Sequence, residues 1–185
     1  MNTMKKSLLL LLPAALLLGR CNKDEQNVAP TGDNEAITTA TLTLTSQTTP
    51  VQTVTATVEN LNASADFSKA TLLLRPNTTY TGTITLLDKT KTPTLDVSAA
   101  VKKEANEHLF VYTPAPASLL TVISTDVDTN PAPGPFPLGL ATQIRTAAAG
   151  TGTLRVVLRH QPDVKNGTPT PGSSDLDITF PVVVQ

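Results

Sequence analysis

The chain of 185 residues contains two histidines, and carboxylate side chains stand close to both in the sequence. His108 directly follows Glu107, and Asp163 comes three residues after His160. Imidazole nitrogens and carboxylate oxygens together form the ligand sets that proteins use for divalent transition metals such as Zn²⁺ and Cu²⁺. These four residues are therefore candidate metal ligands.

A pair of aspartates in the segment 126–130 forms the second candidate. Asp126 and Asp128 precede Asn130, and the three side chains offer the oxygen ligands that Ca²⁺ prefers. The segment is not an EF-hand loop, because Pro131 stands where that loop needs glycine. Two alternatives stay open: structural hydrogen bonds for the histidines, and an ordinary solvated turn for the aspartates.

Four predicted strands must position these side chains: 108–113, 119–128, 137–147 and 153–160. If consecutive strands run in opposite directions, the start of the first lies beside the ends of the second and fourth. We therefore expect the candidate ligands at one pole of the domain: Glu107, His108, Asp126, Asp128, His160 and Asp163. His108 and His160 also continue apolar stripes, so both imidazoles should be half-buried.

Alternation of threonine with apolar residues extends over most of the chain after residue 37, and charged residues are few. The segments are 41–45, 53–58, 80–86, 153–159 and 175–184. This pattern is typical of half-buried antiparallel strands and places Asp175, Asp177 and Thr179 on an outer face. The three leucines at 72–74 are too few to show a period, and we expect a strand buried on both faces.

The sequence therefore predicts an all-β domain over 37–185, an immunoglobulin-like or related Greek-key β-sandwich of seven to nine strands. A short helix is expected at 97–105, with Asp96 as its N-cap. Pro181 lies inside the last segment and predicts an edge strand or a bulge there, because proline lacks a backbone donor.

The first twenty residues have the pattern of an export signal. Lys5 and Lys6 precede an apolar run at 8–18, which is too short to cross a membrane as a helix. The run ends in Leu18-Gly19-Arg20-Cys21, which resembles the lipobox of bacterial lipoproteins. That resemblance implies cleavage before Cys21, acylation of its thiol, and anchoring in a membrane.

The residues after Cys21 predict a flexible tether over 21–36, rich in polar residues. Its Lys23-Asp24-Glu25 run resembles the surface-export signal of lipoproteins from the Bacteroidota. An exported chain with a single cysteine cannot form an internal disulfide, and lipidation would also remove the free thiol. We therefore expect an outer-membrane lipoprotein displayed on the cell surface.

Charge and motifs limit the classes of function. The formal net charge is −1 and becomes about −4 once Lys5, Lys6 and Arg20 leave with the signal, since 11 basic residues then face 15 acidic ones. This balance disfavours nucleic acid as a partner. The sequence has no Gly-x-Ser-x-Gly elbow, phosphate-binding glycine loop or Cys-x-x-Cys pair, so a non-enzymatic role is predicted.

Several motifs together resemble an uncharacterised family of Bacteroidota lipoproteins encoded beside TonB-dependent receptors: 107–108, 79–87, 150–154, 158–162 and 177–182. The family often carries the label "type 1 periplasmic binding fold superfamily", which implies two α/β lobes and disagrees with the strand pattern of this chain. What the resemblance implies is a ligand-binding accessory to a TonB-dependent uptake receptor, with a metal (Zn, Cu or Ca) as candidate cargo. The alternative is a structural or adhesive surface module that binds other proteins.

Overall fold

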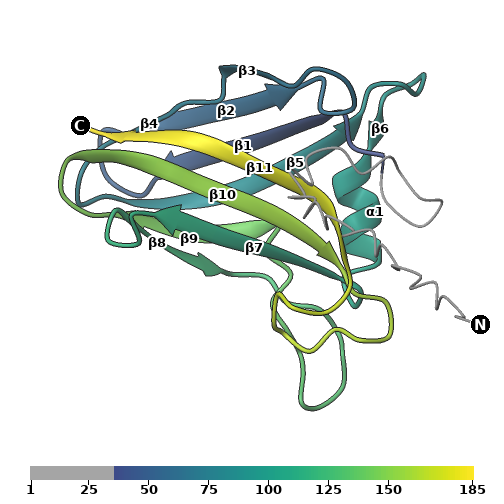
Figure 1. Ribbon diagram of the computed structural model, residues 1–185. Helices are drawn as coiled ribbons and strands as arrows, with labels where there is room; N and C mark the ends of the chain where they lie inside the picture. Colours follow the sequence, from purple (N-terminus) through teal and green to yellow (C-terminus); the bar gives the residue numbers. More distant parts are fainter. Residues whose placement is uncertain (1–35) are drawn as a thin grey trace, which may run out of the picture.

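The computed structural model describes residues 36–185, which form two β-sheets packed face to face with one short helix at one end (Figure 1). The elements are β1 (Thr39–Ser46), β2 (Thr53–Glu59), β3 (Asp66–Lys69), β4 (Leu72–Leu74), β5 (Thr79–Asp88), β6 (Leu95–Asp96), α1 (Val97–Lys103), β7 (His108–Ala115), β8 (Leu120–Ser124), β9 (Ala141–Thr146), β10 (Gly150–His160) and β11 (Ser173–Val184). The predicted all-β sandwich is confirmed. The predicted signal, Cys21 and the Lys23-Asp24-Glu25 run lie outside the described residues.

The larger sheet has the strand order β3-β2-β1-β5-β9-β8, with β6 paired to β5, and the smaller has the order β4-β11-β10-β7. These residues contain eleven strands rather than seven to nine. The additional ones, β3 and β6, have four and two residues and are too short to show alternation.

The core lies between the two sheets and consists of the apolar members of the alternating segments. Leu42 and Ile84 come from the larger sheet, Leu154 and Phe180 from the smaller, and each is 3% exposed or less. Tyr80 is also fully buried, and its hydroxyl donates to Oε1 of Gln52 at 2.6 Å. Burial of one apolar face on each strand is what fixes which residues point outward.

The helix is where the sequence places it. The Asp96 side chain accepts the N–H of Ala99 at 3.3 Å, so it caps α1, and Val97 and Val101 are buried against the sandwich. The helix ends at Lys103, two residues before the predicted end. Its C-cap, Glu104, leads directly toward β7 and helps to position the start of that strand.

The last strand differs from its prediction. β11 lies between β10 and β4 rather than at an edge, and Pro181 pairs in regular register with Thr153. Parallel pairing with β4 begins only at Val182, so at Pro181 β11 has a single partner strand. β4 was expected to be buried on both faces, but its central residue Leu73 is 49% exposed because this edge strand has one face in solvent.

Candidate functional site

The two histidines form a cross-strand pair at one pole of the sandwich. His108 begins β7, His160 ends β10, and the two residues lie opposite each other in the register of these antiparallel strands. Their rings stack with centroids 4.9 Å apart and planes inclined by 12°. The expected proximity of the histidines at one pole is confirmed.

His108 lies in a fully enclosed setting, with its side chain 1% exposed. Its Nδ1 stands 3.0 Å from the carbonyl oxygen of Glu104, which only accepts, so Nδ1 carries a hydrogen. Its Nε2 is 3.6 Å from Oδ2 of Asp175, whose side chain is 0% exposed. This separation exceeds hydrogen-bond length, and neither Asp175 oxygen has a hydrogen-bond partner among residues 36–185.

A proton is required between these two groups, because a bare Nε2 lone pair facing a carboxylate would be repulsive. Burial lowers the pKa of His108, but Asp175 and the carbonyl of Glu104 raise it by more, so the net shift of the pKa is upward. The interaction with Asp175 is electrostatic at 3.6 Å. Below the pKa of His108, His108 and Asp175 therefore form a buried ion pair of imidazolium and carboxylate.

A β-bulge turns Asp175 into this position. In the pairing of β10 with β11, Leu158 lies opposite Leu176 and Arg159 lies opposite Ser174, so Asp175 is passed over. Such an extra residue breaks the two-residue period and redirects a side chain. The predicted outward direction of Asp175 is wrong for this reason, and the residue was not among the candidate ligands.

His160 has a separate carboxylate neighbour. Its Nε2 is 3.6 Å from Oε2 of Glu107, but here the side chains are 13% and 44% exposed. The aqueous surroundings weaken this interaction relative to the buried pair. Asp163 lies farther along the same loop in an exposed position with a positive φ of 61°, and it joins neither histidine in an ion pair.

The geometry does not favour a metal centre built from the candidate ligands. Nitrogen lone pairs lie in the plane of an imidazole, so two rings stacked face to face cannot direct them at one ion. Within residues 36–185, no three His, Cys, Asp or Glu side chains are grouped so as to hold a metal. Metal binding stays a prediction without a defined site.

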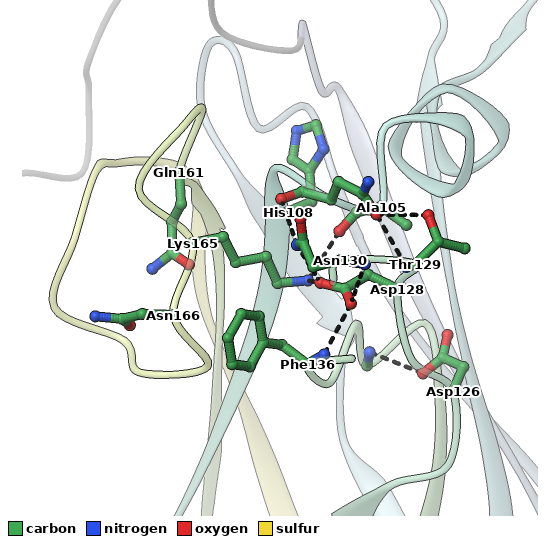
Figure 2. Close-up of polar contacts among 12 residues, drawn as sticks. Ala105, His108, Asp126, Asp128, Thr129, Asn130, Phe136, Gln161, Lys165 and Asn166 are labelled. Atoms are coloured by element: carbon green, nitrogen blue, oxygen red, sulfur yellow. Dashed lines mark hydrogen bonds and ion pairs between the residues drawn. The ribbon is translucent and has the colours of Figure 1, made fainter. Parts of the chain in front are cut away.

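The two aspartates of the predicted calcium segment are engaged by donors. Oδ1 of Asp126 accepts the N–H of Gly139 at 2.8 Å. Asp128 is buried and forms an ion pair with Lys165, with Nζ and Oδ2 2.8 Å apart (Figure 2). Lys165 was not identified from the sequence, where it is a lone basic residue in a loop rich in proline, threonine and glycine. Asp126 therefore closes its own loop, and Asp128 joins that loop to the one that carries Lys165.

The outer face of the larger sheet carries a regular array of threonines on three adjacent strands. Two registers define the array: Thr41, Thr43 and Thr45 of β1 lie opposite Thr57, Thr55 and Thr53 of β2, and opposite Thr85, Thr83 and Thr81 of β5. All nine are exposed or half-exposed. On the far side of β5 the same face continues with Gln143 and Arg145 of β9, and with Thr121 and Ile123 of β8. We call the nine threonines of β1, β2 and β5 the threonine face.

The threonine face contains no charged side chain, and its hydroxyls bond partly to one another. Oγ1 of Thr41 is 3.1 Å from that of Thr57, and the Thr45–Thr53 distance is 3.4 Å. Neighbouring strands are about 4.8 Å apart and alternate residues about 6.7 Å apart along a strand. The result is a regular surface of methyl and hydroxyl groups that can be covered without the desolvation of charges.

Comparisons with known proteins give no relative: no family model, no curated protein and no solved structure matches the chain. Within residues 36–185, no helix combines the length and the apolar character that a membrane span requires.

Proposed function

We propose that this protein is a non-enzymatic lipoprotein, anchored through Cys21 at the outer-membrane surface, that binds a TonB-dependent uptake receptor as its accessory. The anchor is supported by the lipobox-like Leu18-Gly19-Arg20-Cys21 sequence after a short apolar run. Display outside the cell is supported by Lys23-Asp24-Glu25. The choice of a TonB-dependent receptor as partner is supported by the resemblance of the strand motifs to Bacteroidota lipoproteins encoded beside such receptors.

The observation that carries the binding role is the threonine face. Nine uncharged β-branched residues on three adjacent strands are not needed for the core, since their apolar neighbours fill it. The centres of protein–protein interfaces are depleted in charged side chains, and lysine and glutamate in particular are rare there. The nine residues of the threonine face have this composition, whereas Arg145 of β9 lies on the same face between them and β8.

One experiment tests the anchor. Replacement of Cys21 with serine should move the protein from the detergent phase to the aqueous phase, or leave the precursor uncleaved, because no thiol remains for acylation. Replacement of Lys23, Asp24 and Glu25 together should keep the lipid but protect the protein from protease added to intact cells. Partitioning into detergent that survives Cys21→Ser would contradict the proposal.

A second experiment tests the face. Thr43→Lys places a charge at the centre of the array, where solvent exposure lets the domain fold normally. We expect recovery of a TonB-dependent receptor with the affinity-purified lipoprotein to fall by about tenfold or more, which corresponds to ~1.4 kcal/mol. The matched control is Thr179→Lys, on the exposed outer side of β11 in the smaller sheet. Equal recovery with both variants would contradict a role for the threonine face.

The second candidate is an adhesive module that uses the same face to bind a different surface protein. The exposed Ile123 and Phe67, at opposite edges of the larger sheet, favour contact with protein. The two roles differ in the partner that co-purifies. The metal cargo expected from the sequence has no defined site among residues 36–185, and elemental analysis of the purified protein can test it.

A further inference from the structure

A buried ion pair joins the two long loops at the pole of the sandwich. Asp128 belongs to the loop 125–140 between β8 and β9, and Lys165 to the loop 161–172 between β10 and β11. Nζ of Lys165 is 2.8 Å from Oδ2 of Asp128, and the side chains are 1% and 0% exposed (Figure 2). An ion pair so fully withdrawn from water carries a large desolvation cost.

The carboxyl group of Asp128 is held by donors on both oxygens. Oδ1 accepts the backbone N–H groups of Asn130 at 3.1 Å and Phe136 at 2.7 Å. Oδ2 accepts the side-chain amide of Asn130 at 2.7 Å, besides the lysine. Two backbone N–H groups on one carboxyl oxygen have the arrangement of an oxyanion hole, in which they would stabilise negative charge developing on Oδ1.

The amine of Lys165 has two partners as well. Nζ also donates to the carbonyl oxygen of Ala105 at 2.8 Å, which leaves it little freedom to turn away from Asp128. Burial lowers the pKa of Lys165 and outweighs the opposing effect of Asp128, so the neutral, nucleophilic amine is more accessible than on an exposed lysine. The ring of Phe136 lies against Gly167, where an added Cβ would stand 2.9 Å from it.

We propose that Lys165 and Asp128 condense to an intramolecular amide that covalently joins the two loops. A proton passes from the ammonium of Lys165 to Oδ2, and the free amine attacks Cγ while Oδ1 takes the negative charge. A second proton then passes from nitrogen to Oδ2, the Cγ–Oδ2 bond breaks, and water leaves. One ammonium and one carboxylate give one amide and one water, with no oxidant or other reactant.

Proximity and burial favour this reaction. Reacting groups held in contact can reach effective molarities of about 10⁵ M or more. The product also removes two buried charges, whose desolvation opposes folding as long as they persist. Since the chain has one cysteine, an internal disulfide is impossible, and an amide is a cross-link that this chain can form by itself.

Peptide mass spectrometry of the full-length protein, purified from membranes and digested with trypsin under denaturing conditions, tests the proposal. Trypsin cuts after Lys103, Arg145 and Arg159, and it cuts after Lys165 only if the side chain is free. We expect peptides 104–145 and 160–185 to appear as one joined species, lighter than their sum by one water, with fragmentation placing the link at Lys165 and Asp128.

Lys165→Arg keeps a cation but removes the nucleophilic amine, and it should release 160–165 and 166–185 as separate peptides. Lys103→Arg, on the exposed last turn of α1, is the matched control and should leave the joined species unchanged. Peptides 160–165 and 166–185 as the main products of the unaltered protein would overturn the proposal. So would a link from Lys165 to Asn130, recognised by loss of ammonia instead of water.

Discussion

The buried pair of His108 and Asp175 makes the stability of the domain depend on pH in a defined direction. Asp175→Asn keeps the shape of the side chain and removes its charge, while both groups remain enclosed, with side-chain exposures of 1% and 0%. The imidazolium of His108 then loses the carboxylate that raises its pKa and becomes neutral more readily.

The magnitude follows from the geometry. Two unit charges 3.6 Å apart attract each other by ~4.6 kcal/mol at an effective dielectric constant of about 20. In Asp175→Asn no carboxylate has to be desolvated on folding, and this gain offsets part of the lost attraction. We therefore expect the free energy of unfolding to fall by about 2 kcal/mol at pH 6.

The pKa of His108 is raised on folding, so the pair contributes fully to the free energy of unfolding at a pH below the pKa of histidine in the unfolded chain, about 6.5. This stabilising contribution is lost as the pH rises through the pKa of His108 in the folded protein.

Urea denaturation of the protein and of Asp175→Asn between pH 5.5 and pH 9 measures this difference. The difference in the free energy of unfolding between the protein and Asp175→Asn should decrease as the pH rises. The control is Asp177→Asn, two residues along β11, which removes a partly exposed ion pair with Arg155 and should cost about 0–1 kcal/mol. A gap that is the same at pH 6 and pH 9 would refute the proton-sharing pair.

Three further outcomes follow from the packing and the pole. Phe180 is fully buried between the sheets, so Phe180→Ala should lower the free energy of unfolding by about 3–5 kcal/mol; a loss below about 1 kcal/mol in urea denaturation would contradict the assigned core. Gly172 has a φ of 76°, and an added Cβ would overlap the carbonyl oxygen of His160, so Gly172→Ala should lower the melting temperature clearly more than the less crowded Gly150→Ala. Because the histidine rings are stacked, elemental analysis should find less than one zinc or copper per chain, and a stoichiometric metal lost in His108→Ala/His160→Ala would show the stacking to be incorrect.

Much of the fold could be predicted because its information is local. Alternation of apolar residues with threonine located β1, β2, β5, β10 and β11, and Asp96 located the start of α1. The parallel pairing of β4 with β11 could not be predicted in this way. It joins three leucines to residues about 110 positions later, and its cause is packing at the edge of the sheet rather than any local pattern.

The residues at the pole could also be predicted only in part. Strand directions predict that His108 and His160 meet, and they do. The bulge that turns Asp175 inward adds one residue to a strand without any proline or glycine at that position, so counting by twos assigns the wrong face. Lys165 was missed because its partner is set by the path of two irregular loops, which no periodicity describes.

Site-specific photo-crosslinking on intact cells tests the central claim of a surface lipoprotein that binds a receptor through its threonine face. A photoreactive residue at position 83, in the array on β5, should crosslink to a TonB-dependent outer-membrane receptor, and the same residue at position 179, outside the array on β11, should not. Crosslinking to such a receptor from both positions, or from neither, would contradict the account.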